Sequence, residues 1–195
     1  MSLNTAGSGR TVRLIGLCGS LRSASLNRYA LGLAASSLPP GHEMQVLEWR
    51  DVPPFDADLL QKGWPQAVAQ LRRAVAVSDG LVIATPEYNF SVPGMLKNTI
   101  DWLSRGEDQP FAGKPVAILS AATGPLGGAR VQYDLRKIML FVNASVLVKP
   151  EVFIGQAQSK FDPEGNCTDT ATRDFVRAQM KSFASWIEAT QRVRN

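Results

Sequence analysis

Ten residues near the start of the chain, GSLRSASLNR at positions 19–28 (the first loop), combine side chains suited to binding an anion. The polar groups are Ser20, Arg22, Ser23, Ser25 and Asn27, and they surround the expected start of a helix. Free backbone N–H groups and the helix dipole favour an anion there, and hydroxyls and a guanidinium add charge-assisted hydrogen bonds. Because the loop has neither the dinucleotide fingerprint nor the P-loop lysine, it suits a monophosphate better than a triphosphate. The alternative is a helix-capping serine beside an exposed arginine.

A second loop, TPEYNFSVPG at positions 85–94, has a composition suited to a stiff backbone that contacts a flat ligand. Two prolines stiffen its backbone, which can present N–H and C=O groups to a polar ring. Tyr88 is placed to flank or stack on such a ring. The alternative is an ordinary proline-rich turn that precedes a helix.

A third loop, SAATGPLGG at positions 120–128, is made of small residues and contains three glycines, which let the backbone approach a ligand closely. A flexible surface turn is the alternative. Arg130 follows in the first turn of the next helix, where the dipole disfavours a cation. We therefore expect an anionic partner for Arg130: a carboxylate of a neighbouring subunit, a cofactor phosphate, or a nearby surface Asp or Glu.

Apolar strand-like runs alternate with helical patterns and would position these loops. Strands are predicted over 12–18, 43–49, 80–85, 115–121 and 145–154; helices are predicted from Leu26, over 65–78, 94–104 and 127–143, and from about Asp169. Five such strands alternating with helices predict an α/β fold with a parallel sheet covered on both faces. Ligands of these sheets bind beyond the carboxyl ends of the strands, and the three loops follow strands one, three and four. We predict one domain over 11–195, preceded by a disordered leader over 1–10.

Composition narrows the class of function. The net charge of +4 is mild and spread out, which indicates no nucleic-acid surface, and no apolar run reaches the roughly 18 residues of a membrane span. One histidine, His42, leaves little room for a zinc site and weakens the case for a Ser–His triad, so no metal is predicted. The two cysteines lie far apart without a CxxC motif, which favours a reducing cytoplasm.

Taken together, the loops describe a site for a monophosphate joined to a flat heterocycle, as FMN is in flavodoxin. The sequence also resembles the NADPH-dependent FMN reductase family. GSLRSASLNR is similar to that family's G-S-x-R-x-x-S-x-N phosphate loop. PEYNFSVPGMLKNTIDWLSR is similar to its signature P-E-Y-N-x-S-x-P-G-x-L-K-N-x-I-D-W, while GKP before strand four and GGAR after it also fit. The resemblance runs from about residue 12 to 190 and is strongest toward the chromate and quinone reductase branch.

This resemblance implies a flavodoxin-like three-layer sandwich with a five-stranded parallel sheet in the order 2-1-3-4-5. It implies non-covalent FMN, with NADPH or NADH as co-substrate and quinones, azo dyes, nitroaromatics, free flavins or chromate as acceptors. By motif, the phosphate would be held by Ser20, Arg22, Ser25, Leu26 and Asn27. The ring would be held by Pro86, Glu87, Tyr88 and Asn89, with Ser120 and Gly124 as looser matches.

Related enzymes are homodimers or homotetramers, and the helices over 94–104 and 127–143 carry more apolar surface than one sheet face needs, including Trp102, Met139 and Phe141. The alternative is that these side chains belong to the core. We therefore expect a homo-oligomer. Two other functions stay open. A flavodoxin-type electron carrier would share FMN without NAD(P)H activity, and a non-flavin α/β protein would bind a phosphorylated metabolite. The sequence leaves the physiological acceptor and the choice between NADPH and NADH undecided.

Overall fold

The strands of the central sheet all run parallel, in the order β2-β1-β3-β4-β5, and β6 also pairs with β4. The computed structural model describes residues 10–194. In chain order the elements are β1 (Val12–Cys18), α1 (Leu26–Ser36), β2 (His42–Leu47), α2 (Ala57–Gln61), α3 (Gln66–Val77), β3 (Gly80–Ala84), α4 (Gly94–Leu103), β4 (Pro115–Ala121), α5 (Ala129–Phe141), β5 (Ser145–Val146), β6 (Val152–Ile154), the 3-10 turn η1 (Ala157–Ser159) and α6 (Thr170–Arg194). The predicted strand order is thus confirmed.

The two central strands explain the apolar runs in the sequence. Every residue of β3 and of β4 is buried, because helices cover both faces of the sheet there. In contrast, β2 lies at the edge of the sheet and alternates half-buried with exposed positions over its first four residues.

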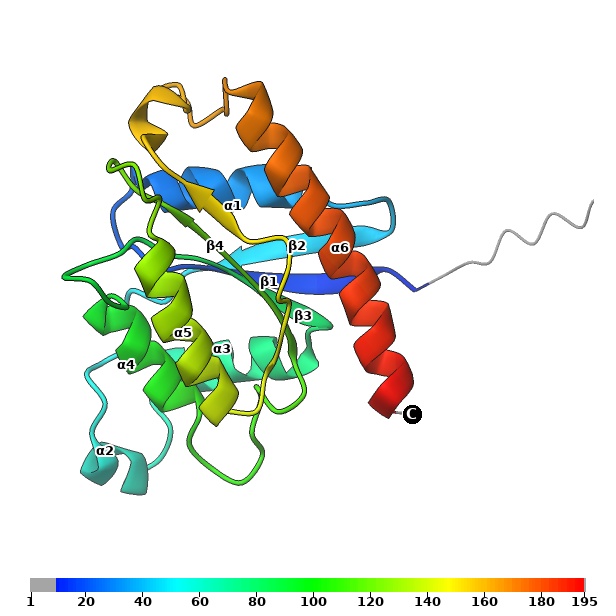
Figure 1. Cartoon of the computed structure of the whole chain (residues 1–195). Helices are drawn as coiled ribbons and strands as arrows, with labels where there is room; N and C mark the ends of the chain where they lie inside the picture. The colour runs from blue at the N-terminus through cyan, green and yellow to red at the C-terminus, as the bar shows by residue number, and fades with distance from the viewer. Residues whose placement is uncertain (1–9, 195) are drawn as a thin grey trace, which may run out of the picture.

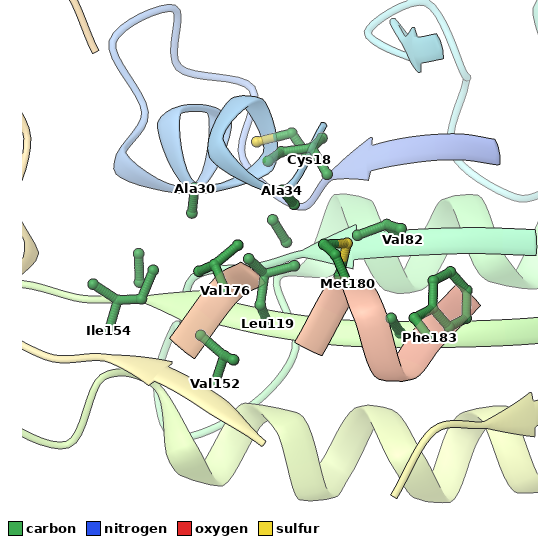
Figure 2. Packing of buried hydrophobic residues seen from close by; sticks show 14 of the residues in the cluster. Cys18, Ala30, Ala34, Val82, Leu119, Val152, Ile154, Val176, Met180 and Phe183 are labelled. Carbon is green, nitrogen blue, oxygen red and sulfur yellow. The ribbon is translucent and has the colours of Figure 1, made fainter. Parts of the chain in front are cut away.

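Helices form a layer on each side of the sheet: α1 and α6 cover one face, and α3, α4 and α5 cover the other (Figure 1). On the first face, Val176, Met180 and Phe183 of α6 pack against the sheet residues Val82 and Leu119 (Figure 2). Each of these large side chains contributes roughly 1.5–3 kcal/mol when it is fully buried. The three layers match the flavodoxin-like architecture.

The fifth strand departs from the prediction of one element over 145–154. It is split into β5 and β6, and the cis peptide between Lys149 and Pro150 lies in the gap. Pairing with β4 stops after Val146 and resumes at Val152, and Pro150 between them has no N–H group to donate to a sheet ladder.

A short helix, α2, lies in the connection between β2 and α3. Asp56 caps it: the Asp56 carboxylate accepts a hydrogen bond from the backbone N–H of Asp58 at 2.8 Å.

The apolar side chains that were taken as surplus on α4 and α5 are only partly at the surface. Trp102 and Met139 are fully buried and belong to the core, which was the alternative for these side chains, whereas Phe141 is 85% exposed. Trp102 is covered by the connection before α2: its ring lies 4.9 Å from that of Phe55, and its indole N–H donates to the carbonyl of Pro53 at 2.8 Å.

The predicted leader over 1–10 lies outside the described residues except for Arg10, whose guanidinium pairs with Asp79. Within residues 10–194, no helix has both the length and the apolar character needed to cross a membrane.

Candidate functional site

The carboxyl ends of β1, β3 and β4 lie side by side, so the three loops of interest leave the sheet at one edge. Cys18 is in register with Ala84, and Ala84 with Leu119. The first two loops begin with a hydrogen bond to the neighbouring strand: Gly19 N–H donates to the Ala84 carbonyl at 2.7 Å, and Thr85 N–H donates to the Leu119 carbonyl at 3.1 Å. Gly19 is required at this close approach, because a Cβ there would lie 2.4 Å from the Thr85 hydroxyl.

The first loop exposes a guanidinium and backbone donors above two buried hydroxyls. Ser20 and Ser25 are buried, and Ser25 caps α1 by accepting a hydrogen bond from the backbone N–H of Asn27 at 3.2 Å. Arg22 is exposed, and its N–H donates to the Ser20 hydroxyl at 3.3 Å. Within residues 10–194, the N–H groups of Leu21, Ser23, Ala24 and Ser25 make no hydrogen bond. Donors that are not used by the chain, together with the N-terminus of α1, favour a bound anion.

Asn27 has a different environment from the rest of the first loop. Its side chain is buried and bridges to the far strand β4: the amide nitrogen donates to the Ala121 carbonyl at 2.8 Å, and the amide oxygen accepts from the Ala121 N–H at 2.9 Å. This side chain therefore fixes the start of α1 against β4. Leu26, the first residue of α1, is half-buried.

The second loop is a tight hairpin with two aromatic side chains at the surface. Tyr88 and Ser91 exchange both backbone hydrogen bonds, at 3.1 and 3.0 Å. The residues between them, Asn89 and Phe90, have positive φ angles of 49° and 68°, the pattern of a type I′ turn. Tyr88 is 47% exposed and Phe90 is 68% exposed. Pro86, which was predicted to contact a ring, lies half-buried at the base of the hairpin.

The hairpin is held by the first two turns of α5. The carboxylate of Glu87 accepts from Arg130 Nε at 2.6 Å and from the backbone N–H of Val131 at 3.3 Å. Arg130 also lies over the ring of Phe90, 3.6 Å from its centroid. Its anionic partner is therefore a carboxylate of its own chain, as in the third possibility named above, except that the Glu87 side chain is buried and not at the surface.

Asp134 supports the same hairpin one turn further along α5. Hydrogen bonds from Lys137 and from Ser91 lower the pKa of the Asp134 carboxyl, so Asp134 stays ionised and linked to the second loop.

The third loop is closely packed at its base and open at its middle. Ser120 is fully buried; its hydroxyl donates to the Gly127 carbonyl at 2.6 Å and accepts from the Gln132 side chain at 2.8 Å. Gly127 has a φ of 59°, and a Cβ on it would lie 2.7 Å from backbone atoms of residues 153 and 155. Gly124 is exposed, and a Cβ there would meet nothing within 4 Å. Of the two looser predictions, only Gly124 presents its backbone at the surface.

Histidine, cysteine and acidic side chains among residues 10–194 are candidates for metal ligands or nucleophiles. No group of three or more His, Cys, Asp or Glu side chains among residues 10–194 is arranged to hold a metal ion. His42 begins β2 and thus lies at the opposite edge of the sheet. Burial raises the pKa of the Cys18 thiol beneath the first loop, so it is protonated at neutral pH and no thiolate nucleophile is available there.

Residues that the sequence analysis missed also reach the first loop. Trp49 donates its indole N–H to the Cys18 carbonyl at 3.0 Å, and the Arg50 guanidinium donates to the Leu21 carbonyl. The one available signal was their position directly after β2, the parallel neighbour of β1.

Comparisons with known proteins agree with this geometry. Residues 12–159 match the family model described as NADPH-dependent FMN reductase. The chain is 42% identical over 176 residues to an NAD(P)H-dependent FMN reductase of Pseudomonas aeruginosa, which covers 90% of this chain and 95% of that protein. It is 44% identical over 180 residues to a quinone reductase of Escherichia coli K12, covering 91% and 96%. Among solved structures, the flavoenzyme NAD(P)H:(acceptor) oxidoreductase FerB from Paracoccus denitrificans superimposes with a TM-score of 0.84 at 32% identity, covering 92% of this chain and 98% of that one.

Proposed function

The chain belongs to the NADPH-dependent FMN reductase family, and we propose that it is an FMN-dependent oxidoreductase that passes electrons from NAD(P)H to quinones. The observation that carries this proposal is the first loop, which presents Arg22 and unused backbone N–H groups at the sheet edge beside an aromatic hairpin. The sequence relatives named for quinone reduction and for NAD(P)H-dependent FMN reduction support the same reaction class.

The residues present fit FMN. We propose that Ser20, Arg22, Ser25 and Leu26 hold its phosphate, through exposed backbone donors, one guanidinium and two hydroxyls. For the ring we propose the backbone of Pro86, Glu87, Tyr88 and Asn89 together with Gly124. Asn27 and Ser120 would support the site indirectly by holding the backbone of the third loop, since their polar atoms bond backbone groups of Ala121 and Gly127.

Bound FMN supplies the electron transfer itself, and the chain supplies orientation and electrostatics. No protein nucleophile or general base is needed, which agrees with a site that contains no histidine. We propose that Tyr88 and Phe90 border the face on which nicotinamide and a flat acceptor bind in turn. Because both ligands would use one face, the kinetics should be ping-pong. We also propose that the acceptors extend to azo dyes, nitroaromatics, free flavins and chromate.

The test begins with the purified protein, FMN, NADPH and NADH, and menadione. The proposal expects FMN to bind, FAD to bind less tightly, and menadione to be reduced with at least one of the nicotinamides. Binding of FMN without NAD(P)H oxidation would indicate the electron-carrier alternative, and failure to bind FMN would indicate the non-flavin alternative. Double-reciprocal plots of initial rate against menadione concentration, at several fixed NADPH concentrations, should give parallel lines. Intersecting lines would reject the ping-pong scheme.

We also propose a homodimer or homotetramer in the cytoplasm. Leu140 and Phe141, at the end of α5, are 78% and 85% exposed, which is a large apolar area to leave in water. The two free, buried cysteines suit a reducing compartment. Light scattering at micromolar concentration and cell fractionation test these two statements, and a monomer mass would contradict the first.

A further inference from the structure

Three consecutive residues that follow β2 each bond a different part of the first loop or its flanking elements. Glu48 pairs with Arg28 of α1, Trp49 bonds the last residue of β1, and Arg50 bonds the loop itself. The placement follows from the sheet: β2 is the parallel neighbour of β1, and Leu47 is in register with Leu17. The segment that leaves β2 therefore emerges beside the first loop. We call residues 48–50 the β2 clamp.

Trp49 holds the end of β1, from which the first loop begins. Its side chain is buried, and its indole N–H donates to the Cys18 carbonyl at 3.0 Å. On the other side of β1, the Gly19 N–H donates to β3. The chain is thus held on both sides at the residue pair where it leaves the sheet.

Arg50 acts on the loop directly. Its guanidinium donates to the carbonyl of Leu21, while its side chain remains at the surface. In a planar trans peptide the C=O of one residue and the N–H of the next point in opposite directions. The bond therefore fixes the plane of the peptide between Leu21 and Arg22, and with it the point from which the Arg22 side chain leaves the loop.

Glu48 links the two basic side chains of this surface. Its carboxylate receives two hydrogen bonds from Arg28, at 2.6 and 3.2 Å. The Arg28 guanidinium lowers the pKa of the Glu48 carboxyl, with a smaller contribution from the charge of Arg50. Arg28 thus bonds Glu48, while Arg50 bonds the Leu21 carbonyl.

We propose that Arg50 is a positioning residue for phosphate binding, which holds the Leu21 carbonyl so that Arg22 and the loop N–H groups face a bound phosphomonoester. The proposal rests on the proposed function, because the phosphomonoester is that of FMN. On this proposal, Arg50 affects the binding of the phosphate group and has little effect on the binding of the flavin ring.

The experiment compares FMN with riboflavin, which carries the same ring and no phosphate. Arg50→Met keeps an unbranched, apolar stem and removes the donors; Arg50→Lys restores a charged donor. Arg73→Ala, which removes an exposed arginine on α3, is the matched control. Flavin fluorescence titrations of the apoprotein give the dissociation constants, and urea denaturation verifies that each variant is folded.

We expect Arg50→Met to weaken FMN binding about tenfold, in line with the loss of a hydrogen bond from a charged group. Riboflavin binding should change less than about twofold, and Arg50→Lys should recover most of the FMN affinity. The FMN defect should also persist in 1 M NaCl, where the Debye length is only about 3 Å, because a bonded loop does not depend on a long-range field.

Several results would overturn the proposal. An unchanged FMN affinity in Arg50→Met, an equal loss for riboflavin, or a defect that disappears in 1 M NaCl would each do so. If Arg50→Met fails to fold, the comparison of Arg50→Lys and Arg50→Gln with the wild type decides, since the lysine keeps a charged donor on a longer stem than that of glutamine. Wild-type protein that binds FMN beside an unaffected variant refutes this inference alone, whereas wild-type protein that binds no FMN refutes the proposed function as well.

Discussion

The carboxylate of Glu87 lies 2.5 Å from a guanidinium nitrogen of Arg130, and this pair joins the second loop to the start of α5. The Glu87 side chain is only 8% exposed, whereas that of Arg130 is 43% exposed. The same guanidinium lies over the ring of Phe90. The position of one aromatic side chain in the hairpin therefore depends on a carboxylate three residues earlier, through an arginine on another element.

Replacing Glu87 with alanine should destabilise the protein by about 1–3 kcal/mol, because the Val131 N–H and the Arg130 guanidinium both lose their acceptor. Urea denaturation measures this change in the free energy of unfolding. Arg177→Ala is the control, since its pair with Asp174 is exposed on both sides and should contribute less than about 1 kcal/mol. Equal effects of the two substitutions would mean that the Glu87–Arg130 pair is an ordinary surface contact.

Arg22→Ala should weaken FMN binding by roughly 1.5–3 kcal/mol, the range for a hydrogen bond to a charged group. The unfolding free energy of the apoprotein should stay near the wild-type value, because the Arg22 side chain is exposed. Fluorescence titration with FMN gives the affinity. A variant with wild-type affinity would show that this guanidinium does not contact the phosphate.

Asn27→Ala should act on the fold before it acts on the cofactor. The substitution leaves the buried N–H and carbonyl of Ala121 without their partners, at a cost of about 1–3 kcal/mol for each unpaired group. Urea denaturation of the apoprotein should reveal this loss. If stability were retained while FMN affinity fell, Asn27 would instead be a phosphate ligand.

Tyr88→Ala should raise the KM for a quinone several-fold and leave FMN retention almost unchanged. The hairpin depends on the backbone groups of Tyr88 and Ser91, which the substitution keeps, while the exposed ring is removed. Steady-state assays with menadione and absorbance of the bound flavin measure the two quantities. Loss of flavin on purification would place the Tyr88 side chain against the cofactor rather than against the acceptor.

Glu48 predicts a pH dependence with a defined sign. Its pKa is lowered in the folded protein, chiefly by the hydrogen bonds from Arg28. The stability that the pair contributes is therefore fully present above the ordinary glutamate value of 4.5 and is lost as the pH falls through the lowered pKa. The difference in unfolding free energy between wild type and Glu48→Gln should stay below about 1 kcal/mol, since the pair is largely exposed. Urea curves from pH 7 down to 3 measure it, and a difference that grows on acidification would reverse the assignment.

The sequence predicted the sheet because β3 and β4 are continuous apolar runs, and it suggested where to look for a site because polar loops follow three of the strands. The errors have specific physical causes. Trp102 looked like surplus surface because its cover, the connection with Pro53 and Phe55, has no periodic pattern. The role of Asn27 depends on a backbone partner, Ala121, whose side chain carries no signal.

The partner of Arg130 was left open for a similar reason. The dipole argument required an anion near the start of α5, and that anion is Glu87, 43 residues earlier in the chain. A one-dimensional pattern shows that a charge needs compensation, but only the packing of the second loop against α5 decides which carboxylate provides it.

The bridge from Asn27 to Ala121, which spans 94 residues, also has a consequence for the order in which a newly made chain can acquire its cofactor. The first loop is synthesised early, but the start of its helix is fixed only by a strand that leaves the ribosome about half a chain later. Ribosome-bound chains that end before β4 should therefore not retain FMN, and retention should begin only after β4 has emerged and docked. Loading of the flavin is thus expected to be a late event in biogenesis, although the residues proposed to bind its phosphate are among the first to be made.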